Sequence, residues 1–157
     1  MAPGEAICYI CHDGGTDENP LKRDCACRGD LNGWTHIPCL VQFIRSKTPE
    51  SAQELYTFHL DGKTDDIWRT CNICKTSYES KIEVDLANAL HRSVVDKDKT
   101  DSLRLFLFLN TAEAYNHARD FEEVVRIFEE IVEIINQNRD EIDTEICHIL
   151  ESYILGG

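Results

Sequence analysis

Hydrophobic residues recur at helical spacing through the second half of the chain, and this pattern predicts a series of helices. In residues 79–95 the apolar positions return every three or four residues, which places them on one helical face; they are Ile82, Leu86, Ala89, Leu90 and Val94. We expect this helix to connect two parts of the protein and to pack against the part before it. The charged run of residues 96–101 then reads as a linker that ends in helix-capping residues.

Two helices joined as a hairpin are predicted after the linker. The first is capped by Asp101 and continues through Tyr115, and the second is capped by Asp120 with Glu123 three residues later. One stripe of the second helix is expected to face the core: Phe121, Val124, Val125, Phe128, Ile131, Val132 and Ile135. A third helix is expected from Asp143 to Gly156 and Gly157.

The hairpin resembles one tetratricopeptide repeat, in which aromatic and small residues recur at set steps. The matching positions are Phe108, Ala112, Tyr115, Phe128 and Ile131. The hairpin departs from the repeat at Arg119, where glycine is usual, and at Val124, where a small residue is usual. Such repeats need about three units for stability, so a generic helical bundle is the alternative.

The first half of the chain shows weaker periodicity. A short helix is predicted from Pro38, with Leu40, Phe43 and Ile44 at helical spacing, and an extra helix after Pro49 with a capping box of Ser51 and Glu54. The sequence D-G-K-T-D-D at residues 61–66 is expected to be a turn.

Soft metal-ligand residues occur in four close pairs in this half: Cys8 and Cys11, Cys25 and Cys27, His36 and Cys39, Cys71 and Cys74. Each pair can direct two donors at one tetrahedral ion, with Zn–S bonds of about 2.3 Å and Zn–N bonds of about 2.0 Å. Eight ligands fill two four-coordinate sites and leave no open position for water, which is typical of structural zinc. The sequence therefore predicts two Zn²⁺ ions; a disulfide framework or scattered core thiols are the alternatives.

Composition limits the remaining classes of function. The 157 residues carry a formal net charge of −13, which opposes binding to nucleic-acid phosphates. The start M-A-P-G-E-A-I-C lacks a signal-peptide pattern, and no apolar run is long enough to span a bilayer. We therefore expect an intracellular, soluble protein, cytoplasmic or nuclear, with no membrane partner, in a compartment where disulfides do not persist.

The ligand pairs lie in four longer stretches: C-Y-I-C (Cys8 to Cys11), C-A-C (Cys25 to Cys27), R-G-D-L-N-G-W-T-H-I-P-C-L (Arg28 to Leu40) and C-N-I-C-K (Cys71 to Lys75). Together these stretches resemble the RING-variant (RING-CH) domain of ubiquitin ligases. The resemblance implies an interleaved cross-brace. One zinc would be held by Cys8, Cys11, His36 and Cys39, and the other by Cys25, Cys27, Cys71 and Cys74.

The expected fold class is a small α+β zinc cross-brace finger followed by an all-α helical hairpin. The expected boundaries are 1–80 for the finger, 81–100 for the connecting helix and linker, and 101–157 for the hairpin. The resemblance covers about the first half of the chain.

The resemblance also implies an activity and a docking surface. RING-type ligases hold a ubiquitin-conjugating enzyme, charged with ubiquitin, in a reactive pose for transfer to a protein substrate, and they use no catalytic residue of their own. The family's docking positions correspond here to Ile10, Phe43 and Lys75. The sequence departs from the family pattern at Phe43, where Trp is usual, and at Asn72, where many classical RINGs have Pro.

A second interpretation is a non-catalytic interaction module. PHD fingers, which read basic histone tails, share the ligand order, and an acidic chain suits such a peptide. They usually have a shorter step from the fourth cysteine to the histidine. The long step from Cys27 to His36 and the C-x-C pair favour the RING variant.

Overall fold

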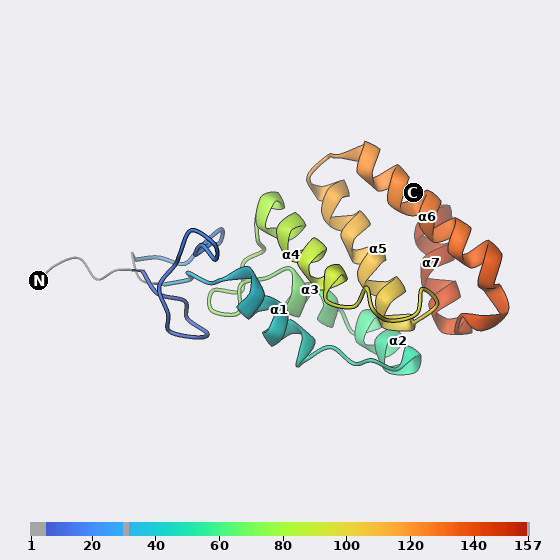
Figure 1. Cartoon of the computed structure of the whole chain (residues 1–157), viewed down its shortest axis with the longest axis horizontal. Helices are drawn as coiled ribbons and strands as arrows, with labels where there is room; N and C mark the ends of the chain where they lie inside the picture. The colour runs from blue at the N-terminus through green and yellow to red at the C-terminus, as the bar shows by residue number, and fades with distance from the viewer. Residues whose placement is uncertain (1–5, 30–31, 157) are drawn as a thin grey trace, which may run out of the picture.

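The computed structural model describes residues 6–29 and 32–156, and it is an elongated molecule with the N-terminal part at one end (Figure 1). Gly157, the last residue of the expected third helix, lies outside that part, as do residues 1–5, 30 and 31. The helices are α1 (Ile37–Arg45), α2 (Ala52–Leu60), α3 (Lys63–Trp68), α4 (Ser80–Arg92), α5 (Ser102–His117), α6 (Phe121–Asn138) and α7 (Thr144–Gly156), with a short 3-10 turn at Arg139–Glu141 before α7.

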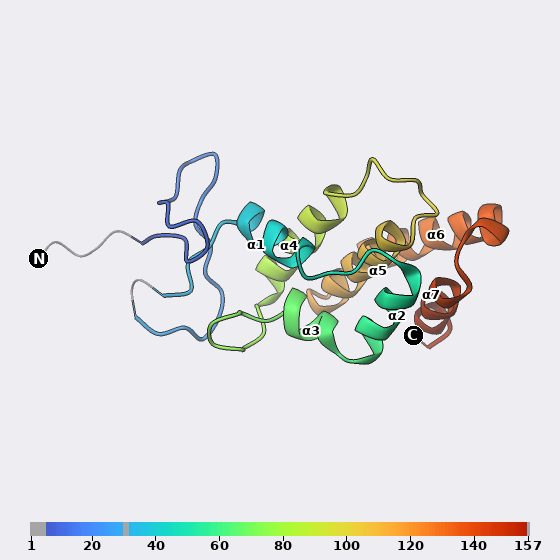
Figure 2. The same cartoon turned by 90° about the horizontal axis from the view of Figure 1, so that it is seen from below.

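The loops that carry the ligand pairs form one end of the molecule, next to α1 (Figure 2). Among the described residues, β structure is limited to three isolated antiparallel bridges: Ile7 with Gly14, Lys22 with Thr35, and Thr70 with Ser77. So few backbone pairs cannot hold such a region together, which therefore depends on its metal sites.

Three helices begin at the caps that the sequence predicted. The backbone N–H of Glu54 donates to the Ser51 hydroxyl at 3.4 Å, and that hydroxyl donates to the Glu54 carboxylate at 2.7 Å. The Asp101 carboxylate caps α5, and Asp120 caps α6 by accepting from the N–H of Glu123 at 3.4 Å. Each cap pairs an N–H group that has no partner within the helix.

The turn expected at residues 61–66 is wrong in its second part, because α3 begins at Lys63. Gly62 has a φ of 70°, a left-handed conformation that glycine adopts without steric cost, so the chain reverses within two residues. The helix then brings Trp68 into the core, where its Nε1–H donates to the hydroxyl of Thr48 at 2.9 Å.

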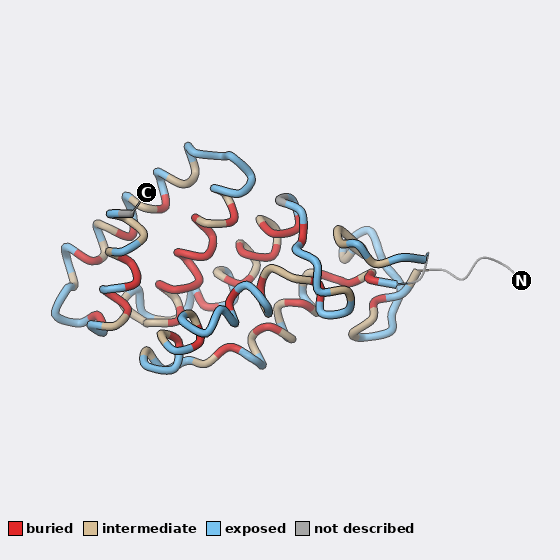
Figure 3. The backbone as a smooth tube through the Cα atoms, turned by 180° about the vertical axis from the view of Figure 1, so that it is seen from behind, coloured by how far each residue is buried: buried red, intermediate tan, exposed pale blue. Residues whose placement is uncertain are grey.

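One hydrophobic core runs from Leu40 in α1 to Leu150 in α7. Helix α4 packs between α1 and α5, as expected of a helix that contacts the finger, and α5 also packs against α6, α2 and α7. Buried positions gather in the helices, whereas the loops that carry the ligand pairs are mostly exposed or half-buried (Figure 3). The boundaries expected at residues 80 and 101 remain predictions from sequence; side chains on both sides of them share this core.

A partly buried ion-pair network joins the end of α3 to α4 and α5. The guanidinium of Arg69 is 14% exposed; its Nη1 atom lies 2.8 Å from Asp65 and its Nε atom 3.4 Å from Glu83 in α4. Its Nη2 atom pairs with Glu113 and donates to the side-chain oxygen of Asn110, both in α5. Because Arg69 stands two positions before Cys71, the network ties the finger to the helices.

The core face expected for α6 is partly wrong. The buried residues of this helix are Ile127, Ile131 and Ile135, whereas Phe121 is 59% exposed and Val125 is 55% exposed. Helix α6 carries two neighbouring apolar lines, and the line with Ile127 packs inward, so the line with Phe121 faces outward. None of the described helices combines the length and apolar composition that crossing a membrane requires.

Candidate metal centre

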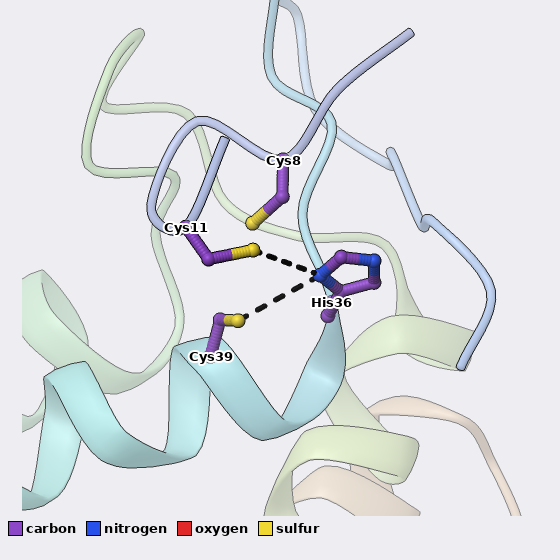
Figure 4. A group of neighbouring side chains, drawn as sticks. All are labelled: Cys8, Cys11, His36 and Cys39. Atoms are coloured by element: carbon purple, nitrogen blue, oxygen red, sulfur yellow. Dashed lines mark hydrogen bonds between the residues drawn. The ribbon is translucent and has the colours of Figure 1, made fainter. Parts of the chain in front are cut away.

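The first cluster contains Cys8 and Cys11 from a loop and His36 and Cys39 from the start of α1 (Figure 4). Their four donor atoms lie within 4.8 Å of one another. The Nδ1 atom of His36 is 3.4 Å from the sulfur of Cys11 and 3.7 Å from that of Cys39. Around a tetrahedral zinc the sulfur–nitrogen separation is about 3.5 Å, so this donor set fits the ion.

The orientation of the His36 ring is fixed from its other side. Its Nε2 atom lies 3.2 Å from the carbonyl oxygen of Gly14. A carbonyl only accepts, so this contact places the ring proton on Nε2 and leaves the lone pair of Nδ1 directed at the thiols. The Gly14 contact could not be predicted from the ligand spacing.

Thiols of the first cluster differ strongly in pKa. Burial raises the pKa of Cys8. The hydrogen bonds from the backbone N–H groups of Cys11, His36 and Ile10 together lower it by more, so the pKa of Cys8 falls to about 6. The pKa of Cys39 is raised to about 12 by burial and by the nearby thiol of Cys11. A bound divalent cation favours the thiolate form of each cysteine in the cluster, so it would remove this difference in protonation between the thiols.

The second cluster joins Cys25 and Cys27 to Cys71 and Cys74, again with all donor atoms within 4.8 Å. The sulfurs of Cys27 and Cys71 are 3.7 Å apart. That separation matches the edge of a tetrahedron with Zn–S bonds of about 2.3 Å, which is about 3.8 Å.

Two residues outside the ligand set shape the second cluster. The hydroxyl of Thr76 accepts from the N–H of Ala26 at 3.0 Å and lies 3.0 Å from the sulfur of Cys74, so it ties both arms together. The backbone of Gly33 passes close to Cys27 and has a φ of 79°. The ligand spacing in the sequence does not reveal this close approach.

Both Cys-x-x-Cys pairs are built in the same way. His12 follows Cys11 with a φ of 65°, and Lys75 follows Cys74 with a φ of 58°. In each loop the N–H of that residue donates at 2.9 Å to the carbonyl of the first cysteine of the pair, Cys8 or Cys71. The left-handed residue closes a tight loop that directs both sulfurs to one side.

The two clusters contain the eight residues predicted as zinc ligands, and their interleaving confirms the cross-brace that the resemblance implied. Both are consistent with a zinc ion held by four protein donors. Such closed sites support a fold and leave no position for a substrate.

The expected docking residues are only partly brought together. Phe43 and Lys75 line one groove of about 400 Å³, whose other lining residues are Lys47, Asp66, Ile67, Thr70 and Asn72. The ammonium of Lys75 is held 3.1 Å from the side-chain oxygen of Asn72. Ile10 does not line this groove; it is half-buried, and its N–H lies 3.4 Å from the sulfur of Cys8. Asp66 and Ile67 both lie in α3, and they were missed because the sequence predicts a turn at residues 61–66 and no helix that would continue to residue 68.

Comparisons with known proteins agree with this geometry. Residues 8–74 match the RING-variant domain family. The chain is 34% identical over 76 residues to the E3 ubiquitin-protein ligase MARCHF8 of Homo sapiens, which is 48% of this chain and 26% of that protein. It is 41% identical over 46 residues to the ERAD-associated E3 ubiquitin-protein ligase DOA10 of Saccharomyces cerevisiae, which is 29% of this chain and 3% of that protein.

The MARCHF8 of Xenopus tropicalis is 50% identical over 40 residues, which is 26% of this chain and 15% of that protein. The chain therefore spans about a quarter or less of the length of the curated relatives it matches. No solved structure matches it.

Proposed function

Residues 8–74 are a RING-variant domain homologous to those of the E3 ubiquitin-protein ligases MARCHF8 and DOA10, and from this premise we propose that the protein is itself a ubiquitin ligase. It would act by holding a charged ubiquitin-conjugating enzyme in the pose from which ubiquitin is transferred to a protein substrate. The family match favours this function over the PHD-like peptide reader.

The proposed reaction requires no catalytic residue of this chain. An amine of the substrate attacks the thioester carbonyl that joins ubiquitin to the conjugating enzyme. An isopeptide bond forms, the carbon–sulfur bond breaks, the enzyme's cysteine leaves as a thiolate, and the amine proton passes to solvent. The ligase lowers the barrier by restricting the orientations of the two reactants. Zinc at the two cross-braced sites would supply the rigidity that such positioning needs.

The groove that contains Phe43 and Lys75 is the observation that supports this proposal most directly. Its apolar side chains, Phe43 of α1 and Ile67 of α3, suit an apolar loop of the conjugating enzyme. Lys75 supplies a cation at the rim, and Asn72 restrains it. We propose that Phe43 anchors the conjugating enzyme, that Lys75 orients ubiquitin, and that Ile10 supports this surface.

The test is discharge of ubiquitin from a panel of charged conjugating enzymes to free lysine. The zinc-loaded wild-type protein should accelerate discharge from at least one of them. Phe43→Ala should reduce the rate by about tenfold or more, because apolar anchors of small interfaces carry about 1–3 kcal/mol. Leu60→Ala is the matched control, since Leu60 is 66% exposed on α2 and does not line the groove.

Lys75→Gln should lower the discharge rate more than the affinity for the conjugating enzyme, because a cation that orients ubiquitin acts mainly in the transition state. Lys81→Gln, an exposed lysine on α4, is its control. Ile10→Ala should also slow discharge; unchanged activity would remove Ile10 from the surface but leave the ligase function. Failure of the folded, zinc-loaded protein with every conjugating enzyme would reject the ligase function.

The helices after the finger are the proposed contact for a substrate or another partner protein. MARCHF8 and DOA10 match this chain over only 76 and 46 residues, so the identity of that substrate is not carried over from them.

A further inference from the structure

Helix α6 presents a line of apolar side chains to the outside, which we call the outer face. It consists of Phe121 and Val125, which are 59% and 55% exposed, and of Phe128 and Val132, which are half-buried; Phe128 also packs against the core. The steps between these residues are four, three and four, the alternation by which one helix keeps a seam against a second helix. An open hollow of about 510 Å³ lies over this face.

A row of carboxylates borders the outer face on one side: Glu122, Glu129 and Glu133, at steps of seven and four. In the part of the chain that the structure describes, none of these three forms an ion pair. Glu133 accepts only from the side-chain amide of Gln137, at 2.9 Å.

The acidic residues further round α6 are different. Glu123 and Glu130 pair with Arg126, with nitrogen–oxygen distances of 2.8 and 3.5 Å. Glu129 and Glu133 share a hollow with Lys99 and Arg104 but form no ion pair with them, so the carboxylates beside the apolar line can accept an external cation.

We propose that the outer face of α6 binds an amphipathic helix of another protein, whose apolar stripe is flanked by Lys or Arg. The 4-3-4 spacing of the outer face favours a helical partner, because two helices pack along apolar residues that repeat at alternating steps of three and four. The unpaired carboxylates along one border call for a basic flank, since charges beside a helical seam select the partner.

A second copy of this chain fits poorly on the same face. The formal net charge of the chain is −13, so two copies repel each other. Neither copy would offer the other a basic flank along this helix: Arg126 is its one cation between Phe121 and Asn138, and it is already paired. Binding at this face does not depend on the proposed ligase function, and the two can fail separately.

The test uses the full chain and two synthetic helical peptides of roughly 18 residues, which is about five turns. Both peptides carry Leu at 4-3 spacing; one has Lys and Arg on its flanks and the other has Glu. Isothermal titration at moderate salt should show that the basic peptide binds at least about tenfold more tightly than the acidic one. Equal affinity for the two peptides, or no binding of either, would overturn the proposal.

Variants then locate the binding site. Val125→Ser should weaken the basic peptide by about tenfold or more, because it removes an apolar contact at the centre of the seam. The double variant Glu129→Lys with Glu133→Lys should reverse the preference toward the acidic peptide. Glu130→Lys is the matched control, because Glu130 lies beyond the border row, and it should keep the basic preference.

Two results would contradict the assignment. An unchanged affinity of Val125→Ser, with circular dichroism showing an intact fold, would place the peptide elsewhere. Sedimentation that shows a wild-type dimer, lost in Val125→Ser, would identify a second copy as the occupant and overturn the proposal of a basic partner.

Discussion

A Cβ atom at position 33 would lie 2.7 Å from the Cβ of Cys27, closer than two such carbons can approach. It would also stand 3.1 Å from the sulfur of Cys25. Gly33→Ala should therefore displace the C-x-C ligands and lower the zinc content from two ions per chain toward one. Elemental analysis of the purified variant measures this loss.

Gly62 provides the control for that substitution. It has a φ of 70°, close to the 79° of Gly33, but nothing lies within 4 Å of a Cβ placed on it. Gly62→Ala should cost only the strain of a left-handed alanine, about 1–2 kcal/mol, and should keep both zinc ions. Equal zinc loss in the two variants would mean that backbone strain, and not the contact with Cys27, is responsible.

Replacing Arg69 should destabilise the junction between the finger and the helices. Arg69→Met leaves the carboxylate of Glu113, which is 21% exposed, without its cation, and that of Glu83, which is 9% exposed, with only the His117 ring at 2.8 Å. Loss of one partner from a buried ion pair costs about 3–5 kcal/mol, and the partial exposure here points to the lower end of that range. Urea denaturation measures the change in the free energy of unfolding.

Arg126→Met is the matched surface substitution. Arg126 also pairs with two glutamates, but its side chain is 56% exposed, so its removal should cost less than about 1 kcal/mol. A loss in Arg69→Met no larger than that in Arg126→Met would show that the Arg69 network does not stabilise the junction.

His91 should make stability depend on pH. Its ring stacks on Phe108 with centroids 4.4 Å apart, and burial, with help from Arg104 and Arg92, lowers the pKa of His91 to about 4. An unfolded histidine titrates near 6.5. Between these values the unfolded chain binds a proton that the folded chain does not, so stability falls as pH falls from about 6.5 to about 4.

His91→Phe removes the titrating imidazole and keeps a flat ring stacked on Phe108. From about pH 7.5 to about pH 5.5 the wild type should lose up to about 1 kcal/mol more stability than the variant, a figure reduced for partial exposure. Denaturation curves at the two pH values measure it. Protonation of the zinc ligands affects both proteins and cancels in the comparison; parallel losses would exclude His91 as the source.

Metal content should follow the two clusters. The wild type is expected to carry two zinc ions, and Cys25→Ser should lose the ion of the second cluster and unfold the finger, because the metal-binding free energy is also folding free energy. The helices α5, α6 and α7 should keep their circular dichroism signal. Cys147→Ser is the control, since this buried cysteine of α7 belongs to neither cluster, and it should retain both ions.

Local signals in the sequence were sufficient where the physics is local. The capping residues Ser51, Asp101 and Asp120 fixed where three helices begin, and ligand spacing identified the metal residues. The outcome was different where tertiary packing decides. Helix α6 has two adjacent apolar lines of similar composition, and only the position of α5 determines that Ile127 is buried and Val125 is not.

The candidate docking groove shows the same limit. Phe43 and Lys75 were identified through family resemblance, but the contribution of Ile67 depends on α3, which begins one residue after a left-handed glycine. The contact from Gly14 to His36 joins positions 22 residues apart through a carbonyl group, which no side-chain pattern reveals.

The shared core has a consequence for how this finger can be used. Leu40 and Ile44 of α1, 2% and 1% exposed, belong to the same core as the helices after residue 80, and α1 packs directly against α4. A shortened chain that stops at residue 80 would uncover both side chains and invite aggregation. We therefore expect that the finger of this protein cannot be transferred to another protein by itself, and that a functional transfer must include α4 and α5.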